Sequence, residues 1–172
     1  MSTLRKGISS RFLTRPYTRK SKFKKFSYIS TIPESKIVKY NFGNPKKTYK
    51  YVINLVSKQD LNLRHNALES ARLVITRDLE TTINGSYFFK INVIPHHIIR
   101  ENKMLTGAHA DRLQTGMAHS FGKPMGRAAR VHKGDNVVVA KVDENGIETV
   151  KNAYRKAVSK LPGKYSIEVK EQ

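Results

Sequence analysis

The chain has 172 residues and carries 33 Lys and Arg side chains against 13 Asp and Glu, a formal net charge of +20. It contains no Cys, which excludes disulfide scaffolds, thiolate zinc sites and cysteine nucleophiles, and no apolar run approaches the ~18 residues of a membrane-spanning helix. Hydrophobic residues make up 38% of the chain, below the roughly 45–50% of globular proteins, so we predict a modest core beside a large cationic surface.

Residues 1–35 are predicted to form a basic arm that is disordered when free. Residues 1–30 hold no acid, and aromatic residues are interleaved among their cations. Cations neutralise phosphates and aromatic rings stack on unpaired bases, so the arm favours a nucleic acid as partner. Two alternatives stay open, namely a mitochondrial presequence and a basic face that is merely solvated.

Residues 36–172 are predicted to form a single domain. A short strand is expected at 37–40, ended by turn residues at 41–45, and a second strand at 49–55, where apolar and polar residues alternate. A helix capped by Asp60 or Asn62 follows.

That helix has a buried stripe at three- and four-residue spacing, made of Ala67, Leu68, Ala71, Val74, Ile75 and Leu79. Alternation predicts a further strand at 87–93, ended by Pro95.

The second half begins with a Gly-rich loop, 102–126, that has few core residues; a loop of this length is usually functional or disordered. A hairpin is expected around residues 133–135, followed by a helix over 150–161 and a last strand at 165–169. Strands and helices interleave without βαβ spacing. We therefore predict an α+β fold, a mostly antiparallel sheet with two packed helices.

No enzymatic site emerges from the motifs. Between Gly116 and Gly122 there are five residues where a nucleotide-binding loop has four, and Pro124 stands where that loop needs Ser or Thr. The backbone there could still approach a phosphate chain closely.

The six histidines match no zinc spacing, and the side chains of adjacent His96 and His97 should diverge if the backbone is extended. Two other functions stay open: a small RNA-modifying or RNA-cleaving enzyme that uses histidines, and a protein that binds anionic membranes.

One stretch carries a specific pattern: IPHHIIRENKM (94–104), GAHADRLQTGM (107–117) and SFGKPMG (120–126). RPYTRK (15–20) and RHNALE (64–69) add to it. Over about residues 15–165 the chain resembles the universal large-subunit ribosomal protein family that is called ten-e in archaea and eukaryotes and is related to bacterial protein sixteen. The absence of Cys favours an archaeal member.

The resemblance implies an α/β-hammerhead fold and a structural, non-enzymatic role in the cytoplasmic ribosome, without a cofactor, metal, membrane or homo-oligomer. The implied partners are large-subunit rRNA near the aminoacyl-tRNA site, neighbouring large-subunit proteins, and tRNA in the aminoacyl site or also in the peptidyl site. The protein would help to order the RNA of the tRNA-accommodation and peptidyl-transferase region. Two positions depart from the family pattern, Asn92 and Ala118, and we assign no RNA contact to them.

The residues expected to bind rRNA are Arg15, Arg19, Lys20, Lys22, Lys24, Arg64, Lys103, Lys123, Arg127 and Arg130. The resemblance also implies a loop that points toward tRNA and the peptidyl-transferase centre. Its residues are Thr106, Gly107, Ala108, His109, Ala110, Asp111, Arg112, Leu113, Gln114, Thr115, Gly116 and Met117. Arg112 could equally pair with Asp111 or Glu101.

Overall fold

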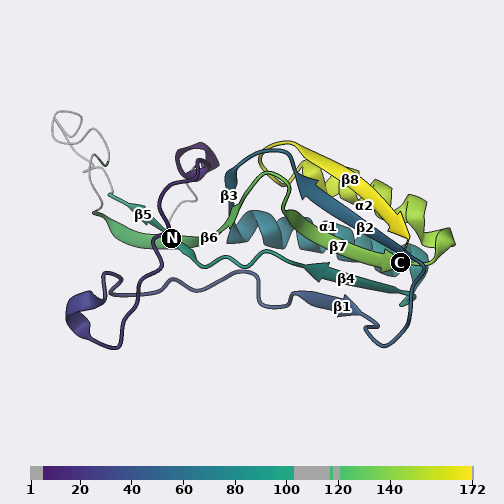
Figure 1. The fold of residues 1–172 in the computed structure, drawn as a ribbon, viewed down its shortest axis with the longest axis horizontal. Helices are drawn as coiled ribbons and strands as arrows, with labels where there is room; N and C mark the ends of the chain where they lie inside the picture. Colours follow the sequence, from purple (N-terminus) through teal and green to yellow (C-terminus); the bar gives the residue numbers. More distant parts are fainter. Residues whose placement is uncertain (1–5, 103–116, 118–120, 172) are drawn as a thin grey trace.

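The computed structural model describes residues 6–102, 117 and 121–171. In this part of the chain, two antiparallel sheets and two α-helices form an elongated molecule (Figure 1). The five-stranded sheet has the order β1-β4-β7-β2-β8 and the three-stranded sheet the order β3-β6-β5. The predicted α+β class, with antiparallel pairing and two helices, is confirmed.

The elements of the five-stranded sheet are β1 (Asn41–Gly43), β2 (Tyr51–Ser57), β4 (Tyr87–Ile91), β7 (Asn136–Val142) and β8 (Tyr165–Glu171). The three-stranded sheet contains β3 (Leu61–Arg64), β5 (His97–Glu101) and β6 (Lys123–Val131). The helices are α1 (His65–Ile83) and α2 (Ile147–Val158), and short 3₁₀ helices lie at η1 (Gly7–Ser10), η2 (Lys24–Phe26) and η4 (Glu144–Gly146).

The core lies between the five-stranded sheet and the two helices, which pack against each other on one of its faces (Figure 1). The predicted stripe of α1 is confirmed at Leu68, Ala71, Ile75 and Leu79, all of which are buried. At the centre, the Tyr154 hydroxyl of α2 donates a hydrogen bond of 3.1 Å to the carbonyl of Ile53. This bond satisfies a polar group that burial has removed from water.

The first strand lies later than predicted. Residues 37–40 lie outside the sheet. The chain joins the sheet at Tyr40, whose carbonyl accepts a hydrogen bond from Ile91 N. β1 then occupies part of the predicted turn, because the left-handed residue that reverses the chain is Gly43, with φ of 80°. A side chain there would be strained, and its Cβ would also collide with the carbonyl oxygen of Tyr87.

The predicted helix cap at Asp60 or Asn62 is wrong, because β3 intervenes and α1 begins at His65. Both polar side chains satisfy backbone groups elsewhere. Asp60 Oδ1 accepts from Lys133 N at 2.7 Å, and Asn62 Nδ2 donates to the Phe12 carbonyl at 2.7 Å. Asp and Asn are residue types that cap helices, so the sequence predicted a hydrogen bond to a nearby backbone group. In the fold, both side chains bond to backbone groups far away in the sequence.

The predicted hairpin around residues 133–135 is also wrong. The turn itself is present, with Asp135 N donating to the His132 carbonyl at 3.1 Å. However, β6 pairs with β3 and β5, whereas β7 pairs with β2 and β4. The connection thus passes from one sheet to the other and joins the two ends of the molecule.

The end of the predicted loop 102–126 differs as well. β6 begins at Lys123, so residues 123–126 are strand, and β5, which the sequence patterns do not predict, precedes the loop. Residues 103–116 and 118–120 lie outside the described part of the chain.

Candidate nucleic-acid interface

The basic arm lies against the three-stranded sheet, at the end of the molecule away from α2 (Figure 1). Asn62 on β3 holds its first part, because its backbone N donates to the Arg11 carbonyl at 2.8 Å and its Nδ2 to the Phe12 carbonyl. Ile29, farther along the arm, is buried. The structure therefore attaches the arm to the domain, while disorder of the free arm stays a prediction.

A buried histidine on β5 provides a second attachment. His97 Nδ1 accepts a hydrogen bond from Tyr17 N at 3.0 Å, and Ile98 N donates to the Tyr17 carbonyl at 3.0 Å. Burial, the nearby Arg130 and Arg100 guanidiniums and His96 lower the pKa of His97. This keeps the ring neutral near pH 7, and a neutral ring nitrogen can accept.

A second histidine acts in the same way at the end of the arm. His65 Nδ1, at the start of α1, accepts from Lys36 N at 2.8 Å. Burial and the positive charges of Lys36, Arg127 and Arg64 lower the pKa of His65. Arg127 on β6 completes this attachment, since its Nε donates to the Pro33 carbonyl at 2.5 Å.

The five predicted RNA-contacting residues of the arm are all exposed: Arg15, Arg19, Lys20, Lys22 and Lys24. Lys123, at the start of β6, is exposed too. These six cations can all reach a phosphate chain without rearrangement of the fold. Whether they do so stays a prediction.

The other described candidates are half-buried and partly committed within the protein. Arg64 lies beside Gly7, whose Cβ, if present, would be 3.5 Å from Arg64 Nη2. Arg127 holds Pro33, and Arg130 lies near His97. The Nε of Arg130 and the Nη1 of Arg100 are buried without a hydrogen-bond partner among the described residues. Such donors are costly unless an acceptor reaches them.

Lys103 and residues 106–116 lie outside the described residues, so their contacts with RNA and tRNA stay predictions. Of the predicted tRNA-proximal loop only Met117 is described. It lies beside Gly122 at the start of β6 and is 36% exposed.

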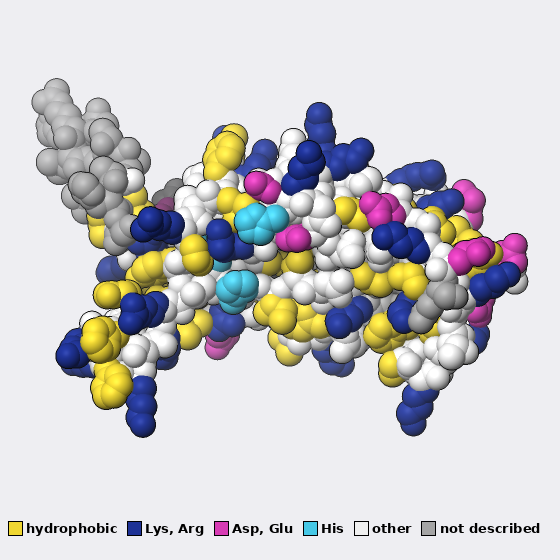
Figure 2. Space-filling view, in the orientation of Figure 1, with side chains coloured by type: hydrophobic (Ala, Val, Ile, Leu, Met, Phe, Trp, Pro, Cys, Tyr) yellow, Lys and Arg dark blue, Asp and Glu magenta, His cyan; other side chains and the backbone are white. Residues whose placement is uncertain are grey.

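The charge is unevenly distributed over the molecule. The arm from residue 6 to 33 has cations and no acid, whereas the acids lie mainly toward the end that carries α2 and β8 (Figure 2). At that end cations are paired, as in Lys156 with Asp78 at 2.9 Å and Lys47 with Asp143 at 2.7 Å. The arm end is thus the surface on which a polyanion would meet the least repulsion.

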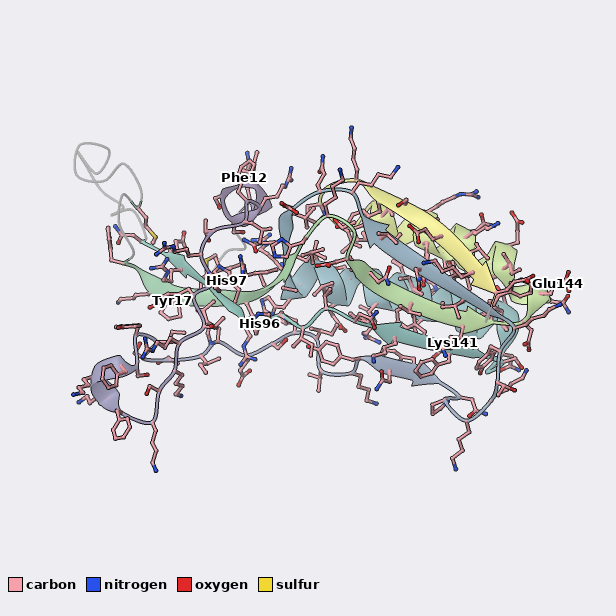
Figure 3. The ribbon with its side chains drawn as sticks, in the orientation of Figure 1. Phe12, Tyr17, His96, His97, Lys141 and Glu144 are labelled. Carbon is pink, nitrogen blue, oxygen red and sulfur yellow. The ribbon has the colours of Figure 1, made fainter. Side chains whose placement is uncertain are left out.

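Sequence reasoning missed the residues that position the arm, above all His97, His65 and Asn62. The divergence of His96 and His97 is confirmed, since His96 is exposed and His97 points toward the arm at Tyr17 (Figure 3). The sequence feature that could have indicated burial of His97 is the apolar pair Ile98 and Ile99, which follows it directly. All three residues are buried on β5. No sequence pattern indicated that the arm would cover these residues.

Searched over residues 6–102, 117 and 121–171, the structure holds no group of three His, Asp or Glu side chains that could bind a metal. Neither α1 nor α2, the helices described, is long and apolar enough to cross a membrane.

Comparison with known proteins gives a consistent result. Residues 14–168 match the family described as "Ribosomal protein L16p/L10e". The chain is 44% identical over 158 residues to the "Large ribosomal subunit protein uL16" of Hyperthermus butylicus, covering 91% of this chain and 84% of the relative.

Two further relatives with the same name are similarly close. The protein of Staphylothermus marinus is 47% identical over 148 residues, which cover 86% of this chain and 82% of the relative. That of Metallosphaera sedula is 42% identical over 163 residues, with coverage of 92% and 90%.

Proposed function

The chain belongs to the ribosomal protein L16p/L10e family, and we propose that, as a structural constituent of the large ribosomal subunit, it binds large-subunit rRNA near the aminoacyl-tRNA site. Its role there is to help order the RNA that receives tRNA, within the cytoplasmic ribosome. Its partners are this rRNA, neighbouring large-subunit proteins, and tRNA in the aminoacyl and peptidyl sites. The family's members are named as ribosomal proteins, not as enzymes.

The observation that carries the proposal is the arm, which has no acid before Glu34 and is held against the three-stranded sheet. Tyr17 and His97 are 80 positions apart in the chain but are hydrogen-bonded, and Arg127 reaches Pro33 over 94 positions. These bonds gather arm cations and sheet cations on one surface. Fixing cations before binding lowers the entropy lost when they meet phosphates.

The chemistry of the surface suits folded RNA. A-form helices hide their major groove, so proteins contact them through phosphates and 2′-hydroxyls and read their shape. In this proposal, exposed arm cations such as Arg15 and Lys20 contact phosphates. Arg127 mainly positions the arm, and half-buried Arg130 is a further candidate for a phosphate contact.

The segment from Thr106 to Met117 has its own part in the proposal. Within the family pattern it would point toward the peptidyl-transferase centre and bound tRNA. The placement of this segment rests on the sequence pattern alone. The substitutions that test the interface therefore leave the segment unchanged.

The experiment compares two sets of neutralising substitutions in the full chain. One replaces Arg15, Arg19, Lys20, Lys22 and Lys24 with Gln. The matched control replaces the same number of cations toward the opposite end, namely Lys47, Lys151, Arg155, Lys156 and Lys170. Affinity for purified large-subunit rRNA is measured between about 50 and 200 mM salt, a range in which several phosphate contacts weaken binding strongly.

We expect the arm set to lower the slope of log K against log salt by about one for each phosphate that the chain no longer neutralises, and the control set to leave the slope almost unchanged. Equal slopes for the two sets would contradict the proposed interface. As a second readout, the wild-type chain should co-sediment with large subunits on a sucrose gradient and leave them at high salt.

A further inference from the structure

Residues 17–28 of the arm form a closed loop. The Tyr17 hydroxyl donates a hydrogen bond of 2.7 Å to the Tyr28 carbonyl and so joins the two ends. At the tip, η2 is formed by Phe26 N donating to the Phe23 carbonyl at 3.0 Å and Ser27 N to the Lys24 carbonyl at 3.1 Å. Figure 1 shows this loop projecting from the body at the end occupied by β5 and β6. We call it the Tyr17–Tyr28 loop.

The base of the loop is held firmly on β5. Tyr17 N donates a hydrogen bond to the His97 Nδ1 side-chain atom, and the Tyr17 carbonyl accepts one from Ile98 N. The Arg100 guanidinium lies over the Tyr17 ring, with its Cζ 4.0 Å from the ring centroid. Figure 3 shows Tyr17 beside His97 at the root of the projection. The loop therefore has a fixed direction before it meets any partner.

The surface of the loop combines rings and positive charge. Three aromatic side chains are exposed, with 64% of Phe23, 60% of Tyr28 and 38% of Phe26 accessible. Five cations accompany them and no acid does: Arg19, Lys20, Lys22, Lys24 and Lys25. Figure 2 shows hydrophobic and basic side chains together at this projection. Exposed aromatic clusters on a small protein usually mark a binding site.

The rings and cations are also stacked on one another. Arg19 Cζ lies 5.5 Å from the ring centroids of both Phe26 and Tyr28, and Lys25 Nζ lies 4.9 Å from that of Phe26. Phe23 meets Phe26 edge to face, with centroids 6.4 Å apart. The outer ring, Phe23, is the most exposed of the series and has a face on which a further flat group can stack.

We infer that the Tyr17–Tyr28 loop is a stacking site for unpaired nucleotides of RNA, with Phe23 and Tyr28 against bases and the surrounding lysines against phosphates. This inference rests on the proposed rRNA binding and adds where in the chain unpaired bases are held. Every base offers a flat π face and every nucleotide a negative charge, which are the two features that the loop's surface complements.

A membrane surface fits the loop less well. Insertion into lipid needs a continuous apolar face, whereas cations alternate with the rings here and lie directly over Phe26. Preorganisation of the loop also favours the binding of bases. A loop closed by the bond between Tyr17 and Tyr28 loses little further conformational freedom when bases stack on it.

The first experiment uses the absence of Trp from the chain. Phe23→Trp places a single fluorescent reporter at the outer ring, and Leu73→Trp places a matched one at an exposed position on α1, which is 54% accessible. On addition of purified large-subunit rRNA, we expect Trp at position 23 to be quenched and protected from acrylamide, as a stacked ring is. Trp at position 73 should stay accessible.

The second experiment separates stacking from charge. Phe23→Leu keeps an apolar side chain but loses the ring, and should weaken rRNA binding about 5- to 100-fold, the range measured for base–aromatic stacking, with the salt slope unchanged. Lys22→Gln should weaken binding less at high salt and lower the slope by about one. Circular dichroism should show both variants folded, since both side chains are exposed.

The outcomes distinguish the two proposals. If the wild-type chain shows no salt-dependent binding to rRNA, the proposed function fails. If wild-type binding is salt-dependent but Phe23→Leu binds as tightly as wild type and Trp at position 23 stays accessible, only the stacking inference fails. Protection of that Trp from acrylamide, with a blue shift of its emission, by vesicles of phosphatidylserine and phosphatidylcholine but not by rRNA would overturn it in favour of a membrane.

Discussion

The two ends of the molecule are held together by different interactions. At one end the five-stranded sheet and the helices bury large apolar side chains such as Phe89, Ile75 and Tyr154. At the other end the arm is fixed to the three-stranded sheet mainly by polar side chains that bond its backbone, namely His97, His65, Asn62 and Arg127. Stability and arm position are therefore separable properties.

The contrast extends to charge. At the helical end, acids neutralise nearby cations, as in the bidentate pair of Arg72 with Glu69 at 2.6 and 2.8 Å. In residues 1–33 of the arm, by contrast, no acid offsets the repulsion between cations. An anionic partner relieves that repulsion, so the arm end gains more from binding than the helical end does.

The largest effect is expected from a core truncation, Phe89→Ala. Phe89 lies in the middle of β4, has no exposed surface, and packs on Phe42 with ring centroids 5.7 Å apart. The lost burial and the cavity should lower the free energy of unfolding by about 3–5 kcal/mol in urea titrations. Affinity of the folded fraction for rRNA should not change, because the arm attachments lie elsewhere.

Phe88→Ala is the matched control. Phe88 is the next residue of the same strand, points to the opposite face and is only half-buried, so its truncation should cost much less. If the two variants lost equal stability, the core would not lie where the structure puts it. If Phe89→Ala also weakened binding of folded protein, the separation between the two ends would be contradicted.

The next effect tests whether Arg127 positions the arm or touches RNA. Arg127→Lys keeps the charge but loses the directed bond from Nε to the Pro33 carbonyl. A charged hydrogen bond contributes about 1.5–3 kcal/mol, so we expect trypsin to cut the arm of the variant faster and the free energy of unfolding to fall by no more than this amount.

The salt slope of rRNA binding gives the other half of this test. It should be unchanged in Arg127→Lys and almost unchanged in Arg127→Gln if the residue acts by positioning. A slope lowered by about one in Arg127→Gln alone would instead assign Arg127 a phosphate contact.

Much of the helical end could be predicted from the sequence. The stripe of Leu68, Ala71 and Ile75 repeats at helical spacing, and such periodicity reflects burial of one face of the helix. Local patterns of this kind need no knowledge of distant parts of the chain. The same holds for the basic arm, whose composition alone indicated an anionic partner.

The arm end could not be predicted, because its bonds join positions far apart. Asn62 looked like a helix cap but supports Phe12, and the turn at 133–135 looked like a hairpin but connects two sheets. His97 gave no metal or catalytic pattern, since its partner is a backbone N–H 80 positions away. The residue types showed which hydrogen bonds each side chain could make, and only the fold determines which of them it makes.

A smaller effect is expected on acidification. The pKa values of His97 and His65 are lowered below the usual 6.5, by burial first and by neighbouring cations second. Below about pH 6.5 the unfolded chain takes up protons that the folded chain does not, so the free energy of unfolding should fall until the lowered pKa values are passed. Above pH 6.5 this contribution is fully present.

Urea titrations at pH 7.5 and 5.5 test this expectation. Each protonated ring loses one acceptor for an arm N–H, worth about 1 kcal/mol. His97→Gln should reduce the difference between the two pH values more than His96→Gln does, because His96 is exposed and is only the last of the causes that lower the pKa of His97. Identical pH dependence in both variants would show that the His97 attachment does not titrate as described.

The smallest effect concerns closure of the Tyr17–Tyr28 loop. Tyr17→Phe removes the hydroxyl that donates to the Tyr28 carbonyl but keeps the ring on which Arg100 lies. Because the bond is exposed, its removal should cost only about 0.5 kcal/mol and weaken rRNA binding two- to three-fold. The control, Tyr28→Phe, keeps the accepting carbonyl and its own ring and should leave the loop closed. Trypsin cleavage within the loop should accelerate in Tyr17→Phe alone. Equal cleavage rates in both variants would mean that the loop is held by β5 through His97 and Ile98, without help from the Tyr17 hydroxyl.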